Sequence, residues 1–394
     1  MTEHSRVQLA PWPHYADDEV AAVTAVLRSG KVNYRTGTIG RAFEADYAAV
    51  LGVPYALAVA NGTVALELAF RALRLGPGDD VIVPARTFIA TAAAVARCGA
   101  RPVVADIDRL SHTLTAETVA AALTPATKAI VAVHIAGWPA DMASLLDLAR
   151  SRGIAVIEDC AQAHGATWRG RPVGAFGDVG CFSFCQDKII STAGEGGLIA
   201  TARADLFKRA WSTREHGWDT DLARTEDPDD GFRWLAADFG TNARMTESQA
   251  AIGQIQLRKL PIWLTRRRAI AAKLADVVRG LAAVTVPDPA PDIGHAYYRR
   301  VLMIEPAALK ASWSRNRVLS ELDRRGIPAR VGACPDITRE QAFVSRGWGP
   351  ARNLPNAAWV GDRSVALPVH PTLTDRDVAM MCETICAVIG EATR

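Results

Sequence analysis

Residues 181–199 read CFSFCQDKIISTAGEGGLI. The pattern predicts an apolar strand at Cys181–Phe184 and a second at Leu198–Thr201, with Lys188 and a small, glycine-containing run between them. Lysine head groups are seldom buried unless they are paired or used covalently. Partial burial would lower the Lys188 pKa and leave neutral amine to attack a carbonyl, as a Schiff-base lysine does. The alternative is a surface lysine on a loop, which is the usual interpretation of an isolated lysine.

Strand and helix patterns alternate through residues 55–158, upstream of this stretch. Apolar strands are predicted at Tyr55–Ala60, Val81–Pro84, Pro102–Ile107, Ala129–Ile135 and Ile154–Glu158, and helices at Val64–Leu73, Phe88–Arg97, Thr115–Leu123 and Met142–Arg152. Continuous apolar strands joined by amphipathic helices indicate an α/β fold with a mostly parallel sheet covered on both faces. Ligands of such sheets bind outside the C-terminal strand ends. We therefore expect the site among residues 61–63, 84–88 and 159–164.

The rest of the chain divides into flanking helices and a second domain. Helices are predicted at Asp17–Ser29, from about residue 41 to Gly52, and from Thr201 to about His216, followed by a long loop with a turn at Asp227–Gly231. A long helix at Glu247–Lys273 is expected to be interrupted at Pro261. Beyond Ala282 come a strand at Tyr298–Ile304, a helix at Val318–Arg325, an extended segment at Ile327–Val331 and a last helix at Asp375–Ile389. We predict a large domain over residues 1–255 and a smaller α+β domain over residues 256–394.

Composition excludes several classes of protein. The 394 residues are 49% hydrophobic and 22% charged, with a formal net charge of only +3 and no Lys/Arg-rich run. A nucleic-acid partner is therefore not expected. No apolar run reaches the length of a membrane span, and no secretory signal is visible. The seven cysteines form no CxxC pair, which favours reduced thiols in a cytoplasmic protein and argues against a zinc site.

A phosphate cradle is one candidate at the strand ends. Asn61, Gly62 and Thr63 lie between a strand and a helix, where backbone N–H groups and a glycine suit a phosphate. Ser183 could add a hydroxyl. Each also has an ordinary interpretation, namely an Asn-Gly turn that caps a helix and a strand serine bonded to backbone.

Asp159 is a second candidate, because it ends a strand. A carboxylate there could keep an electron-sink ring protonated at its nitrogen, although a helix-capping aspartate is the common interpretation. Phe88 could stack on a flat ring or belong to the core. Gln162 and His164 are ambiguous, and His164 is more typical of a structural role. Gly174, Gly177 and Gly180 imitate a dinucleotide fingerprint without the strand and helix that it requires, so we interpret them as turn glycines.

These pieces together resemble the DegT/DnrJ/EryC1/StrS family of sugar aminotransferases, which have the aspartate aminotransferase (type I) fold. The resemblance is densest in ANGTVALELA (60–69), VPARTFIATAAAV (83–95), IEDCAQAHGA (157–166), FSFCQDKIISTAGEGG (182–197) and GTNARMTESQAAIG (240–253). The stretch GACPDITREQAF (332–343) is similar to members encoded with surface-polysaccharide genes, with Thr338 where many carry tyrosine. A lysine at position 188, rather than the histidine of family dehydratases, favours amino transfer.

The resemblance implies pyridoxal 5′-phosphate as cofactor and assigns roles to the candidates. Lys188 and Asp159 would be catalytic, with Lys188 linked to the cofactor and Asp159 paired with the pyridine nitrogen. The remaining cofactor-binding residues would be Gly62, Thr63, Phe88, Gln162 and Ser183, with Asn242 from the partner subunit. Tyr34 and Arg244 are expected at the substrate, but Tyr34 could instead pack under its loop. Arg244 could pair with Glu247, and Asn242 could merely cap the next helix.

The resemblance further implies a homodimer with shared active sites. Glutamate or glutamine would donate the amine, and the acceptor would be a keto sugar linked to a nucleotide diphosphate, destined for a surface polysaccharide or a secondary metabolite such as an antibiotic. The alternatives are a ketocyclitol or an aminobenzoate precursor as acceptor, and a non-catalytic regulatory protein that binds the cofactor.

Overall fold

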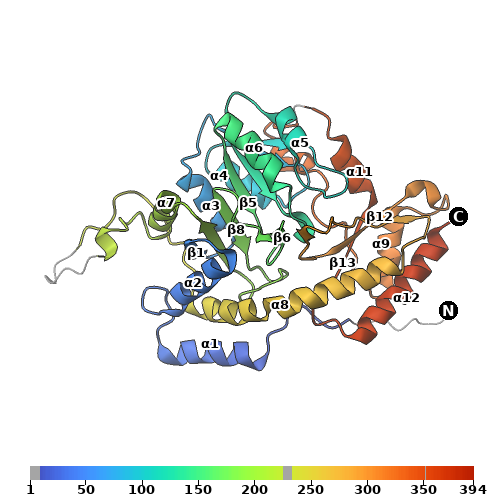
Figure 1. Cartoon of the computed structure of the whole chain (residues 1–394), viewed down its shortest axis with the longest axis horizontal. Helices are drawn as coiled ribbons and strands as arrows, with labels where there is room; N and C mark the ends of the chain where they lie inside the picture. Colours follow the sequence, from blue (N-terminus) through green and yellow to red (C-terminus); the bar gives the residue numbers. More distant parts are fainter. Residues whose placement is uncertain (1–8, 225–232, 351) are drawn as a thin grey trace.

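The computed structural model describes residues 9–224, 233–350 and 352–394 (Figure 1). The turn predicted at Asp227–Gly231 lies outside these residues. In the described part of the chain, no helix has both the length and the hydropathy needed to cross a bilayer.

A seven-stranded sheet forms the centre of the large domain, in the order β1-β9-β8-β5-β4-β2-β3. Only β9 runs against its neighbours, and the other pairings are parallel. The prediction of a mostly parallel sheet is therefore confirmed. The strands are β1 (Tyr55–Val59), β2 (Asp80–Pro84), β3 (Arg101–Ala105), β4 (Thr127–Val133), β5 (Ala155–Asp159), β8 (Val179–Ser183) and β9 (Gly197–Thr201).

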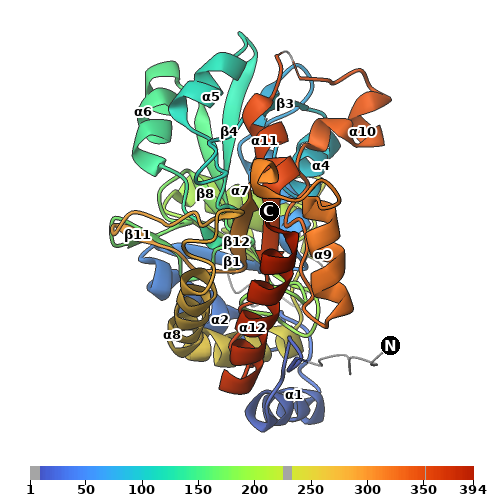
Figure 2. The same ribbon diagram turned by 90° about the vertical axis from the view of Figure 1, so that its right-hand side faces the viewer.

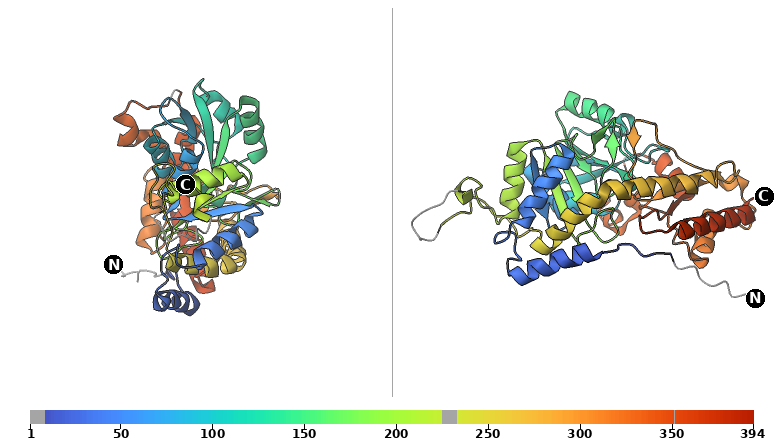
Figure 3. Two further views of the ribbon diagram at one scale, coloured as in Figure 1. Left: turned by 90° about the vertical axis from the view of Figure 1, so that its left-hand side faces the viewer. Right: turned by 60° about the horizontal axis from the view of Figure 1, so that its bottom comes forward.

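Helices cover both faces of this sheet (Figures 1 and 3). One face packs against α3 (Gly62–Ala72), α4 (Ala90–Arg97) and α7 (Ala204–Arg214), and the other against α2 (Ile39–Leu51), α5 (Ala116–Ala122) and α6 (Met142–Arg152). Alternate residues of β1 show how the pattern works: Leu57 and Val59 belong to the first core, and Ala56 and Ala58 to the second. Strands buried on both faces must be apolar at every position.

Helix α8 (Glu247–Asp276) is continuous, so the interruption predicted at Pro261 is wrong. Proline removes one helical hydrogen bond, but Pro261 is exposed, while Leu260 and Leu264 on the buried face anchor the helix on both sides of it. Helix α1 (Asp17–Ser29) lies alongside the first half of α8 (Figure 3).

The C-terminal region builds a second core around a three-stranded sheet, β10 (Val284–Thr285), β12 (Arg300–Ile304) and β13 (Ser364–Leu367). It packs against α9 (Arg315–Arg324) and α12 (Asp375–Ala392) (Figure 2). The hydrophobic cores change along α8 between Leu264 and Ile270. The division proposed at residue 255 thus falls inside this helix. Leu9 also packs against the second core, so the N-terminal segment returns to the smaller domain.

Several short elements have weaker sequence signals. They are β6 (Thr167–Trp168), β7 (Arg171–Pro172), β11 (Ile293–Gly294), α10 (Gln341–Val344) and α11 (Pro355–Arg363). The segment predicted as extended at Ile327–Val331 makes only an isolated bridge, from Arg330 to Ala366. Arg330 of this segment lines the cavity that contains Lys188.

Candidate active site

A cavity of about 920 Å³ opens at the C-terminal ends of the parallel strands. It lies where the topology of the sheet places ligands. The predicted residues that line it are Gly62, Thr63, Phe88, Asp159, Gln162, Ser183 and Lys188. Segments far apart in the sequence therefore converge on one site. Tyr34, Asn242 and Arg244 do not line this cavity within the chain.

Lys188 follows β8 on a turn, and its side chain is only 17% exposed. Its Nζ lies 3.3 Å from Asp187 Oδ1 and 5.1 Å from the centre of the Tyr298 ring. Burial lowers the Lys188 pKa, but Tyr298 and Asp187 outweigh burial, so the pKa lies above its ordinary value. The lowered pKa predicted from the apolar sequence is therefore wrong for this arrangement, because the neighbouring carboxylate favours the ammonium.

Asp159 is the last residue of β5, and its side chain is buried. Oδ2 accepts a hydrogen bond from Thr91 Oγ1 at 2.9 Å, and Oδ1 accepts one from Ala161 N–H at 3.1 Å. No helix begins here, so the helix-capping alternative does not apply. Burial raises the Asp159 pKa despite these bonds. A buried carboxyl of this kind suits a charged nitrogen as a partner.

Phe88 lies between β2 and α4, because α4 begins two residues later than predicted, at Ala90. Its side chain is 66% exposed at the cavity although it is large and apolar. The neighbouring Thr87 is buried and its hydroxyl bonds Thr91, which in turn donates to Asp159. The loop that presents Phe88 is thus tied to the carboxylate, and a flat ring bound there would cover the aromatic face.

The phosphate cradle predicted at residues 61–63 is a helix start. Asn61 caps α3 by accepting from Val64 N–H at 2.9 Å, which leaves the N–H groups of Gly62 and Thr63 without helical acceptors at the cavity. The Asn-Gly turn of the alternative interpretation and the cradle are therefore one structure. A Cβ on Gly62 would lie 2.6 Å from Ser183 Cβ, so only glycine allows this approach. A lysine, a buried carboxyl, an exposed aromatic face and an anion cradle together fit pyridoxal phosphate.

Gly62→Ala is expected to weaken cofactor binding by tenfold or more, about 1.4 kcal/mol, because the added methyl group must displace Ser183 or the helix start. Titration of pyridoxal phosphate into cofactor-free protein measures the dissociation constant. Gly390→Ala is the matched control, since no atom lies within 4 Å of a Cβ added at that helical position. An unchanged affinity in Gly62→Ala would contradict the cradle.

Gln162 and His164 have different surroundings. Gln162 lines the cavity, and its Oε1 accepts from Ala136 N–H at 2.7 Å. His164 is buried behind β8, between the Tyr47 hydroxyl at 2.7 Å and the Ser183 carbonyl at 2.8 Å. Burial lowers the His164 pKa to about 4. The neutral ring holds the strand that carries Ser183, which is a structural role.

Tyr34 and Arg244 belong to a buried charge network. The Tyr34 hydroxyl donates to Glu44 at 2.7 Å under the Arg214 guanidinium, and Glu44 accepts from Arg214 at 2.8 Å. Arg244 pairs with Glu215 at 2.8 Å rather than with Glu247. The Glu247 carboxylate is instead bound to the N–H groups of Ile39 and Gly40, so the pairing suggested by the i,i+3 spacing is wrong.

Asn242 is exposed and forms a backbone bridge with Glu215. The residue that caps α8 is Thr246, whose hydroxyl accepts from Gln249 N–H. The alternative in which Asn242 merely caps the next helix is therefore wrong. Thr338 bonds Asp336 and does not line the cavity either.

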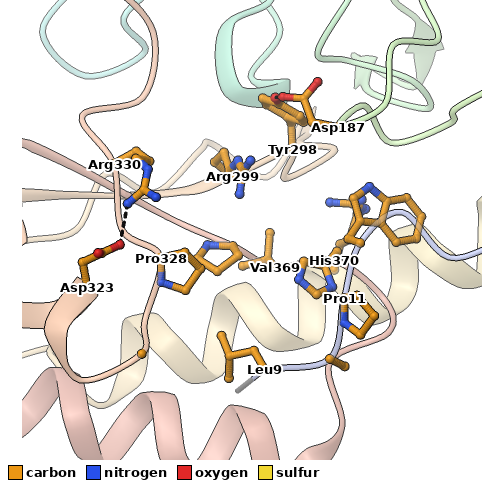
Figure 4. Close-up of a pocket in the computed structure, with 15 residues that line it drawn as sticks. Leu9, Pro11, Asp187, Tyr298, Arg299, Asp323, Pro328, Arg330, Val369 and His370 are labelled. Carbon is orange, nitrogen blue, oxygen red and sulfur yellow. Dashed lines mark hydrogen bonds and ion pairs between the residues drawn. The ribbon is translucent and has the colours of Figure 1, made fainter. Parts of the chain in front are cut away.

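Sequence reasoning missed several polar residues of the site, namely Asp187 beside Lys188 and others from distant segments. A second cavity of about 550 Å³ adjoins the first and shares with it Asp187, Tyr298, Arg299 and Arg330. Figure 4 shows Asp187 and Tyr298 on one wall of it and Leu9 and Pro11 on the opposite wall. Asp187 accepts a hydrogen bond from the Tyr298 hydroxyl and also forms the ion pair with Lys188. Its position next to Lys188 in the sequence was the available signal.

Two of the glycines interpreted as turn residues bind a buried carboxylate through their backbone N–H groups. The N–H groups of Gly174 and Gly177 donate to the buried Glu158 carboxylate at 2.8 Å, and His134 bonds the same carboxylate at 3.1 Å. Gly180 lies within β8, so its interpretation as a turn glycine is wrong. The ligand atoms of His134, Glu158 and Cys160 lie within 4.8 Å of one another, a spacing that a metal site also has. Their oxygens and ring nitrogens are engaged in hydrogen bonds, however, because His134 also accepts from Ala140 N–H. This cluster therefore fixes the strand end that carries Asp159.

Comparison with known proteins agrees with this geometry. The model of the DegT/DnrJ/EryC1/StrS aminotransferase family matches residues 13–386. The UDP-N-acetyl-3-dehydro-α-D-glucosamine 3-aminotransferase of Acidithiobacillus ferrooxidans is 36% identical over 350 residues, which cover 89% of this chain and 88% of that protein. The crystal structure of an aminotransferase from Psychrobacter cryohalolentis is 41% identical with a TM-score of 0.95, covering 98% of this chain and 99% of that chain.

The cofactor is also represented among solved relatives. The pyridoxal phosphate form of the putative sugar aminotransferase Spr1654 from Streptococcus pneumoniae is 25% identical with a TM-score of 0.87, covering 98% and 99% of the two chains. The match to the family model spans both domains and the predicted lysine and carboxylate. The chain belongs to the DegT/DnrJ/EryC1/StrS family of pyridoxal phosphate-dependent aminotransferases.

Proposed function

We propose that this enzyme transfers an amino group from glutamate or glutamine to a keto sugar linked to a nucleotide diphosphate. The observation that carries the proposal is the convergence of Lys188 and Asp159 on one cavity, next to a helix start suited to phosphate. The relative from Acidithiobacillus ferrooxidans, which is named for a nucleotide-linked keto sugar, supports the choice of acceptor. The product would be an amino sugar for a surface polysaccharide or a secondary metabolite such as an antibiotic.

Pyridoxal phosphate, when bound, supplies a carbonyl that carries the amine between substrates and a ring that delocalises an electron pair. Asp159 would hold the ring nitrogen protonated, and Phe88 would cover one ring face. Gln162 would lie beside the ring, while Ser183 and the N–H groups of Gly62 and Thr63 would hold the phosphate. The Lys188 amine, once free, would move a proton to and from the substrate carbon as general acid and base. Asp187, 3.3 Å away, would take part in setting its protonation.

The second cavity supports a nucleotide-linked acceptor. It adjoins the Lys188 cavity and has the size of a typical ligand pocket. Arg267 and Arg299 line it, and Arg267 is buried with its Nε unbonded in the described part of the chain. Both guanidiniums line the same cavity, and burial together with the neighbouring Arg299 lowers the Arg267 pKa to about 9. Such a site suits a diphosphate.

A panel of ketones tests the choice of acceptor. Keto sugars linked to UDP, dTDP and GDP should give kcat/KM values well above those of a ketocyclitol and an aminobenzoate precursor, with glutamate as donor. Preferred turnover of a free cyclic ketone would replace the proposal with the first alternative. A protein that binds the cofactor but does not react with glutamate or glutamine would support the regulatory alternative.

We propose further that the enzyme is a cytoplasmic homodimer with shared active sites. Seven free cysteines agree with a reducing compartment. Asn242 and Arg244 lie outside the cavity of their own chain, on a segment pinned by backbone bonds from Ala60 and by Glu215. A rigid segment that exposes Asn242 outside its own cavity suits contact with the cavity of a second subunit.

Complementation tests the shared site. Lys188→Ala protein and an Asn242→Ala, Arg244→Ala double variant should each be inactive, whereas dimers formed by refolding them together should regain up to about a quarter of wild-type activity. That fraction follows because half of the randomly formed dimers are mixed, and a mixed two-fold dimer has one intact site out of two. Mixed dimers, verified with distinct tags, that stay inactive would contradict the shared site.

A further inference from the structure

Arg86 is a buried cation at the Lys188 cavity that the roles above leave unexplained. It follows β2 at the C-terminal edge of the sheet, two residues before Phe88, and its side chain is 2% exposed. Its Nη2 donates to the Val331 carbonyl at 3.0 Å and to Ser364 Oγ at 3.1 Å. Its Nε and Nη1 have no hydrogen-bond partner in the part of the chain that the structure describes.

No described carboxylate pairs with this guanidinium. Three of its five N–H donors are left, since only the two Nη2 bonds are made. Burial lowers the Arg86 pKa to about 10, and the nearby Arg315 acts in the same direction, against a small opposing effect of Cys334. At neutral pH the group remains a cation, and an unpaired buried charge is costly. By contrast Arg330, on the same wall, pairs with Asp323 at 2.8 Å.

Two residues beside Arg86, His112 and Gly332, also line the cavity. The buried Nε2 of His112 is unbonded among the described residues. Burial and Arg86 lower the His112 pKa to about 3, so the ring is neutral and does not repel an anion. A Cβ on Gly332 would lie 3.0 Å from Arg86 Nη2, so a larger residue at this position would crowd the guanidinium where it borders the cavity.

We propose that Arg86 binds a carboxylate of the substrate inside the Lys188 cavity. Arginine is suited to carboxylates because its planar, weakly hydrated donors make charge-assisted hydrogen bonds. The anion would supply the counter-charge that no described carboxylate provides and would fix the substrate on the side of the cavity formed by Arg330 and Gly332. The carboxylate belongs either to the amino-acid donor or to an acidic sugar of the acceptor. Because both are substrates of the proposed reaction, the inference rests on the proposed function.

The test compares Arg86→Gln and Arg86→Lys with the wild type, all loaded with cofactor. Arg315→Gln is the matched control, because Arg315 donates to the Ser364 carbonyl at 2.8 Å but does not line the cavity. The first arm measures glutamate dissociation constants from the single-turnover loss of visible absorbance, and glutarate binding by calorimetry. The second arm measures KM for two acceptors, a nucleotide-linked keto sugar and the corresponding uronic acid.

If the donor supplies the carboxylate, Arg86→Gln raises the glutamate and glutarate dissociation constants by at least tenfold, and Arg86→Lys restores part of the loss. If the acceptor supplies it, glutamate binding is unchanged and KM rises only for the uronic acid. A purely structural Arg86 would lower the melting temperature and leave both arms at the values of Arg315→Gln, which would overturn the proposal. The first arm needs no sugar acceptor, so failure of the proposed acceptor class would be recognised separately.

Discussion

Replacement of Lys188 with alanine is expected to lower amino transfer by about 10⁴-fold, because the proton-transfer group and the covalent attachment are lost together. The side chain is 17% exposed, and its Nζ contacts only Asp187 and the Tyr298 ring among the polar and aromatic groups described. Removal of it therefore leaves the strands on both sides intact. Steady-state amino transfer from glutamate measures the effect.

Borohydride reduction followed by peptide mass spectrometry provides the second readout. The wild-type protein should carry the reduced cofactor on Lys188, and the alanine variant should carry none. Lys208→Ala is the control, since Lys208 pairs with Asp221 on the surface and its side chain is 49% exposed. A lysine-linked adduct that persists elsewhere in the alanine variant would show that Lys188 is not the attachment site.

Asp159→Asn is expected to lower amino transfer by about 10²- to 10³-fold, the scale seen when one electrostatic stabiliser is removed from an active site. Asparagine retains an oxygen that can accept from Thr91 and Ala161 N–H, so the local fold should survive. What is lost is the negative charge facing the ring nitrogen. Asp141→Asn, at the exposed start of α6, is the control. Near-normal turnover in Asp159→Asn would leave Asp159 with a structural role alone.

Asp159→Asn should also stabilise the cofactor-free protein against unfolding at neutral pH. Burial raises the pKa of Asp159 in the folded protein above the pKa of an aspartate in the unfolded chain. Asp159 therefore stabilises the fold fully when the pH is below the unfolded pKa, and this contribution is lost as the pH rises through the folded pKa. At pH 7, above the unfolded pKa of an aspartate, this raised pKa opposes folding, and asparagine, which does not ionise, removes the cost. Thermal melts should show a gain at pH 7 that disappears below about pH 4. A loss of stability at pH 7 would contradict the assignment of burial as the dominant effect.

The strand–helix alternation predicted the sheet and a site at its strand ends, where Phe88, Asp159 and Gln162 line the cavity, but Arg86 and Tyr298 gave no such signal. Each parallel strand is a continuous apolar run, and the chemistry lies where those runs end, as at Asp159. The reversed direction of β9 was not predictable from apolar runs, because pairing depends on the long-range register with β1 and β8. Pro261 was misleading because packing of Leu260 and Leu264 outweighs a single lost hydrogen bond.

The electrostatics of the site were less predictable than its location. The Lys188 pKa depends on how Asp187 and Tyr298 are oriented, and Tyr298 comes from a segment about a hundred residues away. Arg86 gave no signal at all, since it reads as one arginine in VPARTF. Its burial depends on Val331 and Ser364, which lie 245 and 278 residues further along the chain. Buried charges become visible only when the tertiary contacts are known.

Transfer of nitrogen between the two substrates tests the central claim most directly. Cofactor-loaded enzyme is incubated with ¹⁵N-labelled glutamate, and with ¹⁵N-amino-labelled glutamine in parallel, together with keto sugars linked to UDP, dTDP and GDP. Mass spectrometry then follows each nucleotide-linked product. We predict that at least one product contains a single ¹⁵N in place of the keto oxygen, and that Lys188→Ala gives none. Wild-type enzyme that removes the label from the donor but transfers it to no nucleotide-linked sugar would contradict the account.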